Sequence, residues 1–182
     1  MKVYIVRHTS VVLDGNETCY GFSDVQTRES FEQEAEQTKQ TLETLLRGEA
    51  PVEAVFTSPL SRAAKLAAYV GYPDAQRDDR LKEMNFGAWE LRPWAELMQG
   101  KSYEEFFSYY IDHPTPGGES LMMQYERVRD FILEQKAWGY SSILVFCHGG
   151  VINCARALSG ECELRNAFAL LPGFGSVTEL EF

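Results

Sequence analysis

An arginine and a histidine stand together where the first apolar segment of the chain ends. Residues 3–6 are four apolar residues, which predicts a buried β-strand, and Arg7, His8 and Thr9 follow directly. In open α/β sheets, ligands bind at the carboxyl ends of the strands. A guanidinium beside an imidazole at such an end indicates an oxyanion site that contains a nucleophile. A solvated strand end is the alternative interpretation of this pair taken alone.

A second segment, far down the chain, repeats this plan. The apolar run at residues 143–147 ends in His148, and Gly149 and Gly150 then open a predicted helix. Glycine lets backbone approach a ligand closely, and a helix N-terminus offers unpaired N–H groups to an anion. The chain has only three histidines, and two of them end apolar runs. This coincidence favours one shared anion site over two solvated strand ends.

Another strand end supplies a second arginine. Residues 52–56 predict a short strand, after which Ser58 is a predicted N-cap with Pro59 at the first helical position. Arg62 then lies in the first turn of the helix, close to the end of the strand. Anion binding and a solvated helix face are both open for Arg62 on local grounds.

One carboxylate has unusual surroundings. Glu83 lies in an irregular segment, residues 81–90, that is rich in large apolar side chains. Desolvation in such a place raises the pKa of a carboxyl group, so Glu83 is a candidate general acid. A glutamate in an exposed loop is the alternative.

Composition limits the classes of function. At 182 residues the chain predicts a single domain, and its net charge of −10 argues against nucleic acid or an anionic membrane as a partner. No apolar run reaches the length of a membrane span, and no signal peptide is visible, so we expect a cytoplasmic protein. The four cysteines form no C-x-x-C pair, so we expect free thiols and no metal site.

The first half of the chain predicts elements that position these residues. Residues 11–26 form a polar loop long enough to bind a ligand. Thr27 is the predicted N-cap of an amphipathic helix that ends at Gly48. Residues 74–79 predict a short edge strand.

A helical insertion is predicted at about residues 91–118. It comprises one short helix at 93–98 and a second helix that a capping box at Ser102 opens. The second helix is aromatic, so it is either part of the core or a lid over a substrate ring. His113 lies in a loop beside a proline, and we expect it to be non-catalytic.

The order of elements indicates the fold class. A further helix starts at residues 116–120, and residues 168–171 and 176–182 predict closing strands joined by a turn at 172–175. The β-α-β-α order predicts an α/β fold: a three-layer α/β/α sandwich with a mainly parallel central sheet and helices on both faces.

Taken together, the motifs of this chain resemble the histidine phosphatase superfamily, whose fold is that of phosphoglycerate mutase. The matching motifs lie in family order along the whole chain, which would then be one histidine phosphatase domain, residues 1–182. They are residues 7–9, 58–63, 81–84 with 86–87, 117–120 and 147–150. Within the superfamily, residues 19–25 and 86–90 look like the α-ribazole phosphatase branch. That branch removes phosphate from α-ribazole 5′-phosphate in assembly of the cobalamin nucleotide loop.

The resemblance implies a role for each matched side chain. His8 would be the nucleophile that forms a phosphohistidine, and Arg7 and Arg62 would clamp the phosphoryl oxygens. His148 would stabilise the transferring group, and Glu83 would protonate the leaving oxygen. The residues expected to bind phosphate or substrate are Arg7, Thr9, Asn16, Tyr20, Gly21, Arg62 and Gly149. No metal and no cofactor is expected.

Two positions depart from the family pattern. Many members have an asparagine where this chain has Asp14, with Asn16 close by. Because a carboxylate would repel phosphate, we expect Asp14 to point away from the site. The branch commonly has a glycine at the position of Leu91, which makes the local backbone there an open question.

These observations leave several functions open. The first is a phosphatase for α-ribazole 5′-phosphate, and the second a phosphatase of the same mechanism for another small phosphorylated metabolite, such as a sugar phosphate or nucleotide. A phosphoglycerate mutase needs more substrate-enclosing chain, and a non-catalytic phosphate-binding domain needs neither nucleophile nor acid. A homodimer is a further expectation.

Overall fold

The strands of the described chain form one sheet with the order β3-β2-β4-β1-β5. The computed structural model describes residues 1–14, 17–166 and 171–182. The strands are β1 Lys2–Arg7, β2 Ala54–Thr57, β3 Gln76–Arg77, β4 Ser142–Cys147 and β5 Val177–Glu181. Neighbouring strands are parallel except for β5, which runs antiparallel to β1. The prediction of a mainly parallel sheet is therefore confirmed.

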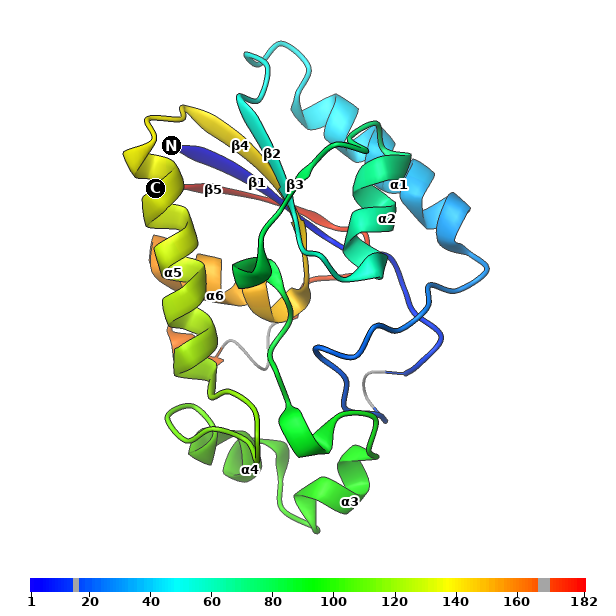
Figure 1. Ribbon diagram of the computed structural model, residues 1–182, viewed down its shortest axis with the longest axis vertical. Coiled ribbons are helices and arrows are strands. Elements are labelled where there is room, and N and C mark those ends of the chain that lie inside the picture. The colour runs from blue at the N-terminus through cyan, green and yellow to red at the C-terminus, as the bar shows by residue number, and fades with distance from the viewer. Residues whose placement is uncertain (15–16, 167–170) are drawn as a thin grey trace.

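Helices cover both faces of this sheet. They are α1 Phe31–Leu45, α2 Ser61–Tyr69, α3 Trp94–Met98, α4 Tyr103–Tyr109, α5 Leu121–Ala137 and α6 Gly149–Ser159, with short 3-10 turns at Asp79–Leu81, Gly87–Trp89 and Leu164–Asn166. In Figure 1, α5 and α6 lie on one side of the strands and α1 and α2 on the other, which is the predicted three-layer arrangement. Helices α3 and α4 lie at the bottom of the view, away from both layers.

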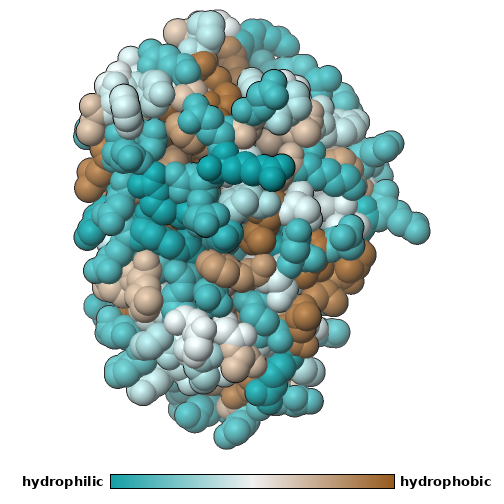
Figure 2. All heavy atoms as spheres, in the orientation of Figure 1, coloured by the Kyte–Doolittle hydropathy of each residue, from teal (hydrophilic) through white to brown (hydrophobic). Residues whose placement is uncertain are grey.

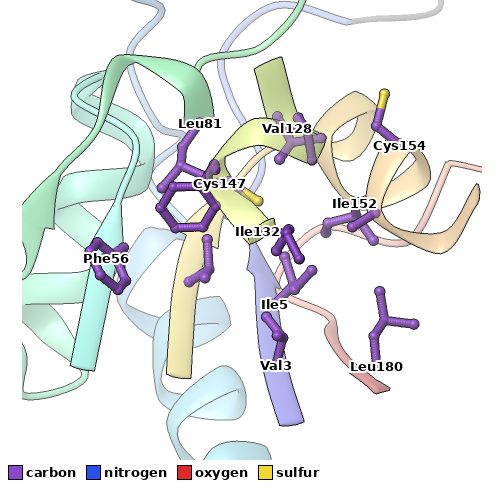
Figure 3. Packing of buried hydrophobic residues seen from close by; sticks show 14 of the residues in the cluster. Val3, Ile5, Phe56, Leu81, Val128, Ile132, Cys147, Ile152, Cys154 and Leu180 are labelled. Carbon is purple, nitrogen blue, oxygen red and sulfur yellow. The ribbon is translucent and has the colours of Figure 1, made fainter. Parts of the chain in front are cut away.

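Alternating side chains of the central strands build the two halves of the core. Val3 and Ile5 of β1 pack toward α5 and α6, in the cluster shown in Figure 3, whereas Tyr4 and Val6 pack toward α1 and α2. All four are almost completely buried. A strand that is covered on both faces needs an apolar residue at every position, which explains the continuous apolar run.

A third, smaller cluster connects the insertion to the rest of the molecule. Its aromatic members pack on one another, with the rings of Trp89 and Phe106 5.1 Å apart and those of Trp94 and Phe107 5.3 Å apart. The buried members are Cys19, Met84, Phe86, Trp89, Phe106 and Phe107. The capping box of α4 is present as predicted, with Ser102 Oγ accepting from the backbone N–H of Glu105. The division of the chain into one domain with an insertion at 91–118 stays a prediction.

Two predicted helix starts were wrong. The first helix begins at Phe31 with Ser30 at its N-cap, because residues 26–28 pair with residues 10–12 in extended conformation. Helix α2 begins at Ser61, whose backbone N–H donates to Asp24 Oδ1 at 2.9 Å. The N-terminus of α2 is thus capped by a residue far away in sequence, which leaves Ser58 outside the helix.

The strand boundaries also differ from the predictions. The edge strand predicted at 74–79 is only two residues long, and β5 covers residues 177–181 of the predicted 176–182. Of the strand predicted at 168–171, residues 168–170 lie outside the described part, and Leu171 is not in a strand. The helix predicted to start at residues 116–120 begins at Leu121, with Ser120 as its N-cap.

The exterior is mostly hydrophilic in the view of Figure 2, with hydrophobic residues gathered in smaller patches. Among the helices of the described residues, none has the length and apolar character that crossing a membrane requires.

Candidate active site

The parallel pairing of β1 with β4 brings the two predicted histidines together. Arg7 stands opposite Cys147 in the register, and the backbone N–H of His8 donates to the carbonyl of Cys147 at 3.0 Å. His8 and His148 are therefore the next residues of two adjacent strands. Their rings lie with centroids 5.1 Å apart, and both side chains are buried.

A backbone carbonyl fixes the proton of His8. The Nδ1 atom of His8 lies 2.6 Å from the carbonyl oxygen of Thr9. Because a carbonyl oxygen only accepts, we assign the ring proton to Nδ1, which leaves a lone pair on Nε2. Burial lowers the pKa of His8 well below its usual value, and the positive charges of Arg62 and Arg7 lower it further. His8 is thus a neutral imidazole with one nitrogen available as a nucleophile.

A hydroxyl group orients His148. The Nε2 atom of His148 lies 2.8 Å from Ser58 Oγ, and Ser58 follows directly on β2, the other neighbour of β4. The Nδ1 atom of His148 is buried and has no hydrogen-bond partner among the described residues. Burial, followed by the charge of Arg62, lowers the pKa of this ring as well.

The guanidinium groups of a buried arginine, Arg62, and a half-buried arginine, Arg7, lie near the imidazoles. Arg62 is 0% exposed and donates to the carbonyls of Gly21 at 2.6 Å and Ser23 at 2.8 Å. Arg7 donates to the carbonyl of Pro172, and its Cζ lies 4.0 Å from the centroid of the Phe174 ring. The Nε atoms of both arginines are buried and have no partner among the described residues. Buried donors of this kind require an acceptor, and an anion between the two arginines would supply it.

Backbone and amide donors hold the carboxylate of Glu83 at the same site. Its Oε1 accepts from the side chain of Gln124 at 3.0 Å and from the backbone of Met84 at 2.9 Å. Its Oε2 accepts from the backbone N–H of Gly150 at 3.1 Å, in the first turn of α6. A Cβ at Gly150 would lie 2.3 Å from Oε1 of Glu83, so only glycine lets the helix approach this carboxylate.

These groups lie at or directly beneath one cavity of about 430 Å³. Its inner end has Arg7, His8, Glu83 and Gln124, and its outer wall is mainly apolar and aromatic. The outer residues include Met84, Phe86, Trp94, Met98 and Phe107, whereas Phe174 lies beside Arg7 and His8. Trp94 and Met98 come from α3 and Phe107 from α4, so the insertion contributes both to the core and to this wall.

The other predicted binding residues have mixed outcomes. Tyr20 lines the cavity, with Arg62 Cζ 5.6 Å from its ring centroid, and its contact with a substrate stays a prediction. The backbone N–H of Gly21 donates to Glu90 and its carbonyl accepts from Arg62, and a contact of Gly21 with substrate stays a prediction. Asn16 lies outside the described residues. Asp14 does line the cavity, so the expectation that it points away was wrong.

Two small predicted residues lie behind the site rather than on its wall. Thr9 is fully buried, and it acts through its carbonyl on His8. A Cβ at Gly149 would lie 3.3 Å from Nε of Arg7, so this glycine makes room for the guanidinium. A contact of either residue with phosphate stays a prediction.

Sequence reasoning missed several residues of the site. The sequence pattern predicts Ser58 as a helix N-cap, although its hydroxyl contacts His148. The sequence pattern indicates no role for Gln124 and places Phe174 only in a turn, although the Phe174 ring lies 5.5 Å from that of His8. A buried polar residue within an apolar stripe was the available signal for Gln124, which is 1% exposed.

The sequence matches a known protein family over almost its whole length. Residues 3–182 match the family model described as the histidine phosphatase superfamily (branch 1). The chain belongs to the histidine phosphatase superfamily. Among the residues that the structure describes, no group of three or more histidine, cysteine or acidic side chains is placed to hold a metal ion.

Individual members of the superfamily are similar over most of the chain. Adenosylcobalamin/alpha-ribazole phosphatase of Escherichia coli is 32% identical over 162 residues, which are 84% of this chain and 76% of that protein. Putative phosphoserine phosphatase 2 of Hydrogenobacter thermophilus is 29% identical over 134 residues, 71% of this chain and 66% of the relative. The predicted phosphatase class of enzyme is confirmed at this level.

Solved structures confirm the predicted fold. Phosphoglycerate mutase from Thermus thermophilus superimposes with a TM-score of 0.78 at 26% identity, over 100% of this chain and 94% of that structure. A mycobacterial glucosyl-3-phosphoglycerate phosphatase superimposes with a TM-score of 0.82 at 21% identity, over 98% of this chain and 88% of that structure. The superfamily fold thus accommodates different phosphorylated substrates, so the substrate has to be inferred from the wall of the cavity.

Proposed function

We propose that this superfamily member hydrolyses a phosphomonoester through a phosphohistidine on His8. The observation that carries the proposal is the meeting of two neutral, buried imidazoles with the guanidinium groups of Arg7 and Arg62, whose buried Nε atoms have no partner among the described residues. Phosphate is an anion that accepts several hydrogen bonds, and forked arginine donors match its geometry. A neutral nucleophile approaches a phosphate dianion without charge repulsion.

In the first step, the Nε2 lone pair of His8 attacks phosphorus and the bond from phosphorus to the ester oxygen breaks. The leaving oxygen takes a proton from the carboxyl group of Glu83, which lines the same cavity. Arg7, Arg62 and the Nδ1–H of His148 stabilise the charge on the transferring group.

In the second step, water attacks the phosphorus of the phosphohistidine. Glu83 takes a proton from this water, the bond from phosphorus to Nε2 breaks, and the lone pair returns to His8. Phosphate is released and both side chains regain their starting protonation states. These residues supply the positive charge and the proton transfers that the reaction needs.

For the substrate we favour α-ribazole 5′-phosphate. This nucleotide carries a benzimidazole ring, and the outer wall of the cavity offers aromatic surfaces at Phe86, Trp94 and Phe107. Stacking and burial of a flat ring suit such a wall. The likeness to the α-ribazole phosphatase of E. coli, at 32% identity, points to the same substrate.

The charges of the cavity count against substrates with a second anionic group. Among the described lining residues, Arg7 is the only lysine or arginine, whereas Asp14 and Glu83 are acidic. None of the six residues that the structure does not describe, 15–16 and 167–170, is a lysine or arginine. A carboxylate such as that of phosphoserine or phosphoglycerate would lack a cationic partner. This observation supports a neutral, ring-bearing alcohol over the alternative substrates and over a mutase.

A panel of phosphomonoesters tests the proposal. The protein should release phosphate from an aryl phosphate, and its kcat/KM should be highest for α-ribazole 5′-phosphate when compared with phosphoserine, a sugar phosphate and a purine nucleotide. Quenching with alkali or a neutral denaturing detergent should trap a base-stable, acid-labile phosphoenzyme that is absent in His8→Ala. A preference for a sugar phosphate would overturn the substrate assignment, and lack of any turnover would favour a non-catalytic binding domain.

A homodimer and a cytoplasmic location stay predictions.

A further inference from the structure

One half-buried carboxylate, Glu90, organises a loop beside the site without lining the cavity. Its Oε2 accepts from the backbone N–H of Gly21 at 2.9 Å and of Ser23 at 3.1 Å. Its Oε1 accepts from the backbone N–H of Phe22 at 3.0 Å and of Phe86 at 3.1 Å. Three consecutive N–H groups of residues 21–23 therefore point at one carboxylate. Such an arrangement of amide dipoles stabilises an anion, and no salt bridge of Glu90 occurs among the described residues.

The carbonyl groups of the same segment point the other way, toward Arg62. Gly21 accepts from Nη2 of Arg62 at 2.6 Å and Ser23 accepts from Nη1 at 2.8 Å. The peptide segment thus links an anion on one side to a cation on the other. Hydrogen bonds in such a chain polarise one another. Burial lowers the pKa of Arg62, and the negative charge of Glu90 is among those that oppose this shift.

Residues 21–23 pack tightly against the segment that carries Glu90, so the two segments can move only together. A Cβ on Gly21 would lie 1.8 Å from the carbonyl oxygen of Met84, so the two backbones are in direct contact. The backbone of Cys19 also pairs with Leu91 and Arg92, through bonds of 2.7 and 2.9 Å. Residues 19–23 and 84–92 therefore form one packed unit. Glu90 is the side chain that connects its two halves through charge-assisted hydrogen bonds.

We propose that Glu90 is a positioning residue for phosphate binding, which acts by holding residues 21–23 so that Arg62 keeps its buried Nε directed at the phosphoryl group. The inference rests on the proposed function for the role of Arg62. Glu90 itself touches neither the substrate nor the reacting atoms. Because Arg62 is fully buried and has two of its three nitrogens on this segment, a shift of the segment shifts the guanidinium with it.

The test compares Glu90→Gln with a matched control, Asp78→Asn. Glutamine keeps the shape of Glu90 but removes its charge and puts an N–H₂ group among N–H donors. Asp78 also accepts a backbone N–H, from Arg80 at 2.8 Å, but it lies beside the edge strand β3 and not at the cavity. For Glu90→Gln we expect KM for 4-nitrophenyl phosphate and the dissociation constant for inorganic phosphate to rise about 10- to 100-fold, the scale of a misplaced binding group. The control should change neither.

Combination with Arg62→Lys separates action through Arg62 from a general loss of structure. If Glu90 acts through Arg62, then Glu90→Gln should weaken phosphate binding no further in the Arg62→Lys background. Additive losses, or equal losses in Glu90→Gln and Asp78→Asn, would overturn the inference. Phosphate binding is read from the rise in melting temperature with inorganic phosphate. This readout stays informative even if the wild-type protein fails to turn over any ester, an outcome that would defeat the proposed function alone.

A measurement on the wild-type protein covers the case in which Glu90→Gln does not fold. Amide hydrogen exchange of residues 19–24 should slow when inorganic phosphate binds, because ligation of Arg62 tightens the segment that holds it. Unchanged exchange in residues 19–24 at saturating phosphate would contradict the proposed linkage.

Discussion

Ser58 Oγ lies 2.8 Å from Nε2 of His148, so the residue that follows β2 orients the imidazole that follows β4. The same hydroxyl oxygen accepts from the backbone N–H of Leu60 at 3.3 Å. We therefore assign the hydroxyl proton to the bond with Nε2, which places the ring proton of His148 on Nδ1. Three parallel strand ends thus cooperate: β1 supplies the nucleophile, β4 the second imidazole and β2 its support.

Removal of this hydroxyl should lower kcat. We expect Ser58→Ala to reduce kcat for 4-nitrophenyl phosphate about tenfold, the scale of one lost hydrogen bond, with a smaller change in KM. Ser58→Thr keeps the hydroxyl and is the matched control. A wild-type kcat in Ser58→Ala, measured by steady-state kinetics, would show that His148 needs no support from Ser58.

The role of Glu83 predicts a dependence on the leaving group. Nitrophenolate leaves readily without a proton, whereas an alkoxide does not. Glu83→Gln should therefore slow the first step about 100-fold more for an alkyl phosphate than for 4-nitrophenyl phosphate. Single-turnover measurements isolate that step from hydrolysis of the phosphoenzyme.

Glu119→Gln is the control for this experiment. Glu119 is a neighbouring carboxylate that pairs with Arg127 at 2.8 Å and does not line the cavity. An equal loss for both substrates in Glu83→Gln would count against protonation of the leaving oxygen by Glu83.

The buried histidines predict how stability depends on pH. Burial and the charge of Arg62 lower the pKa of both rings well below 6.5. Between pH 6.5 and 5 the unfolded chain therefore takes up protons that the folded protein does not. The free energy of unfolding should fall as pH falls in this window, by up to about 1.4 kcal/mol per pH unit for each histidine.

Urea denaturation in phosphate-free buffer measures this slope. His8→Asn should flatten it, whereas His113→Asn, at an exposed position, should follow the wild type. A wild-type protein with constant stability between pH 6.5 and 5 would contradict the low pKa values.

The sequence predicted the parts of the site that depend on one strand and its end. Continuous apolar runs identify β1 and β4, and parallel pairing then necessarily places His8 beside His148. The supporting contacts could not be predicted in this way. Ser58 precedes a proline and so looks like an N-cap, and only the capping of α2 by Asp24 leaves Ser58 available for His148.

The hydrogen-bond partners of Glu90 could not be predicted from the sequence either. They are backbone N–H groups of a distant loop, and backbone donors have no signature in the amino-acid sequence. The start of α1 was wrong for a related reason, because pairing of residues 26–28 with residues 10–12 overrides the local capping pattern at Thr27.

Leu91 occupies a position that favours glycine. Its φ angle is +65°, although its side chain is 57% exposed and gains little from packing. The open question about this backbone is thus answered: the conformation suits glycine, but leucine adopts it.

Left-handed backbone costs a leucine about 1–2 kcal/mol, and the greater freedom of unfolded glycine offsets about half of that. Leu91→Gly should therefore raise the melting temperature by about 2 °C. Leu91→Ala retains a Cβ and should give no increase, so equal melting temperatures of the two variants would refute this account.

The aromatic outer wall should discriminate between substrates by the ring they carry. Trp94 lies in α3, with its ring 5.5 Å from that of Phe86 and 5.3 Å from that of Phe107. If a benzimidazole packs on this wall, Trp94→Ala should lower kcat/KM for α-ribazole 5′-phosphate about 10- to 100-fold, the range for loss of one stacking partner of a base. Glycerol 2-phosphate has no ring to stack, so its kcat/KM should stay within about twofold, since the phosphate contacts lie at the inner end of the cavity.

Trp138→Ala, at a tryptophan that is 73% exposed and does not line the cavity, serves as the control and should affect neither substrate. Equal losses for both substrates in Trp94→Ala would mean that Trp94 only stabilises the fold. The aromatic wall would then no longer support a ring-bearing substrate.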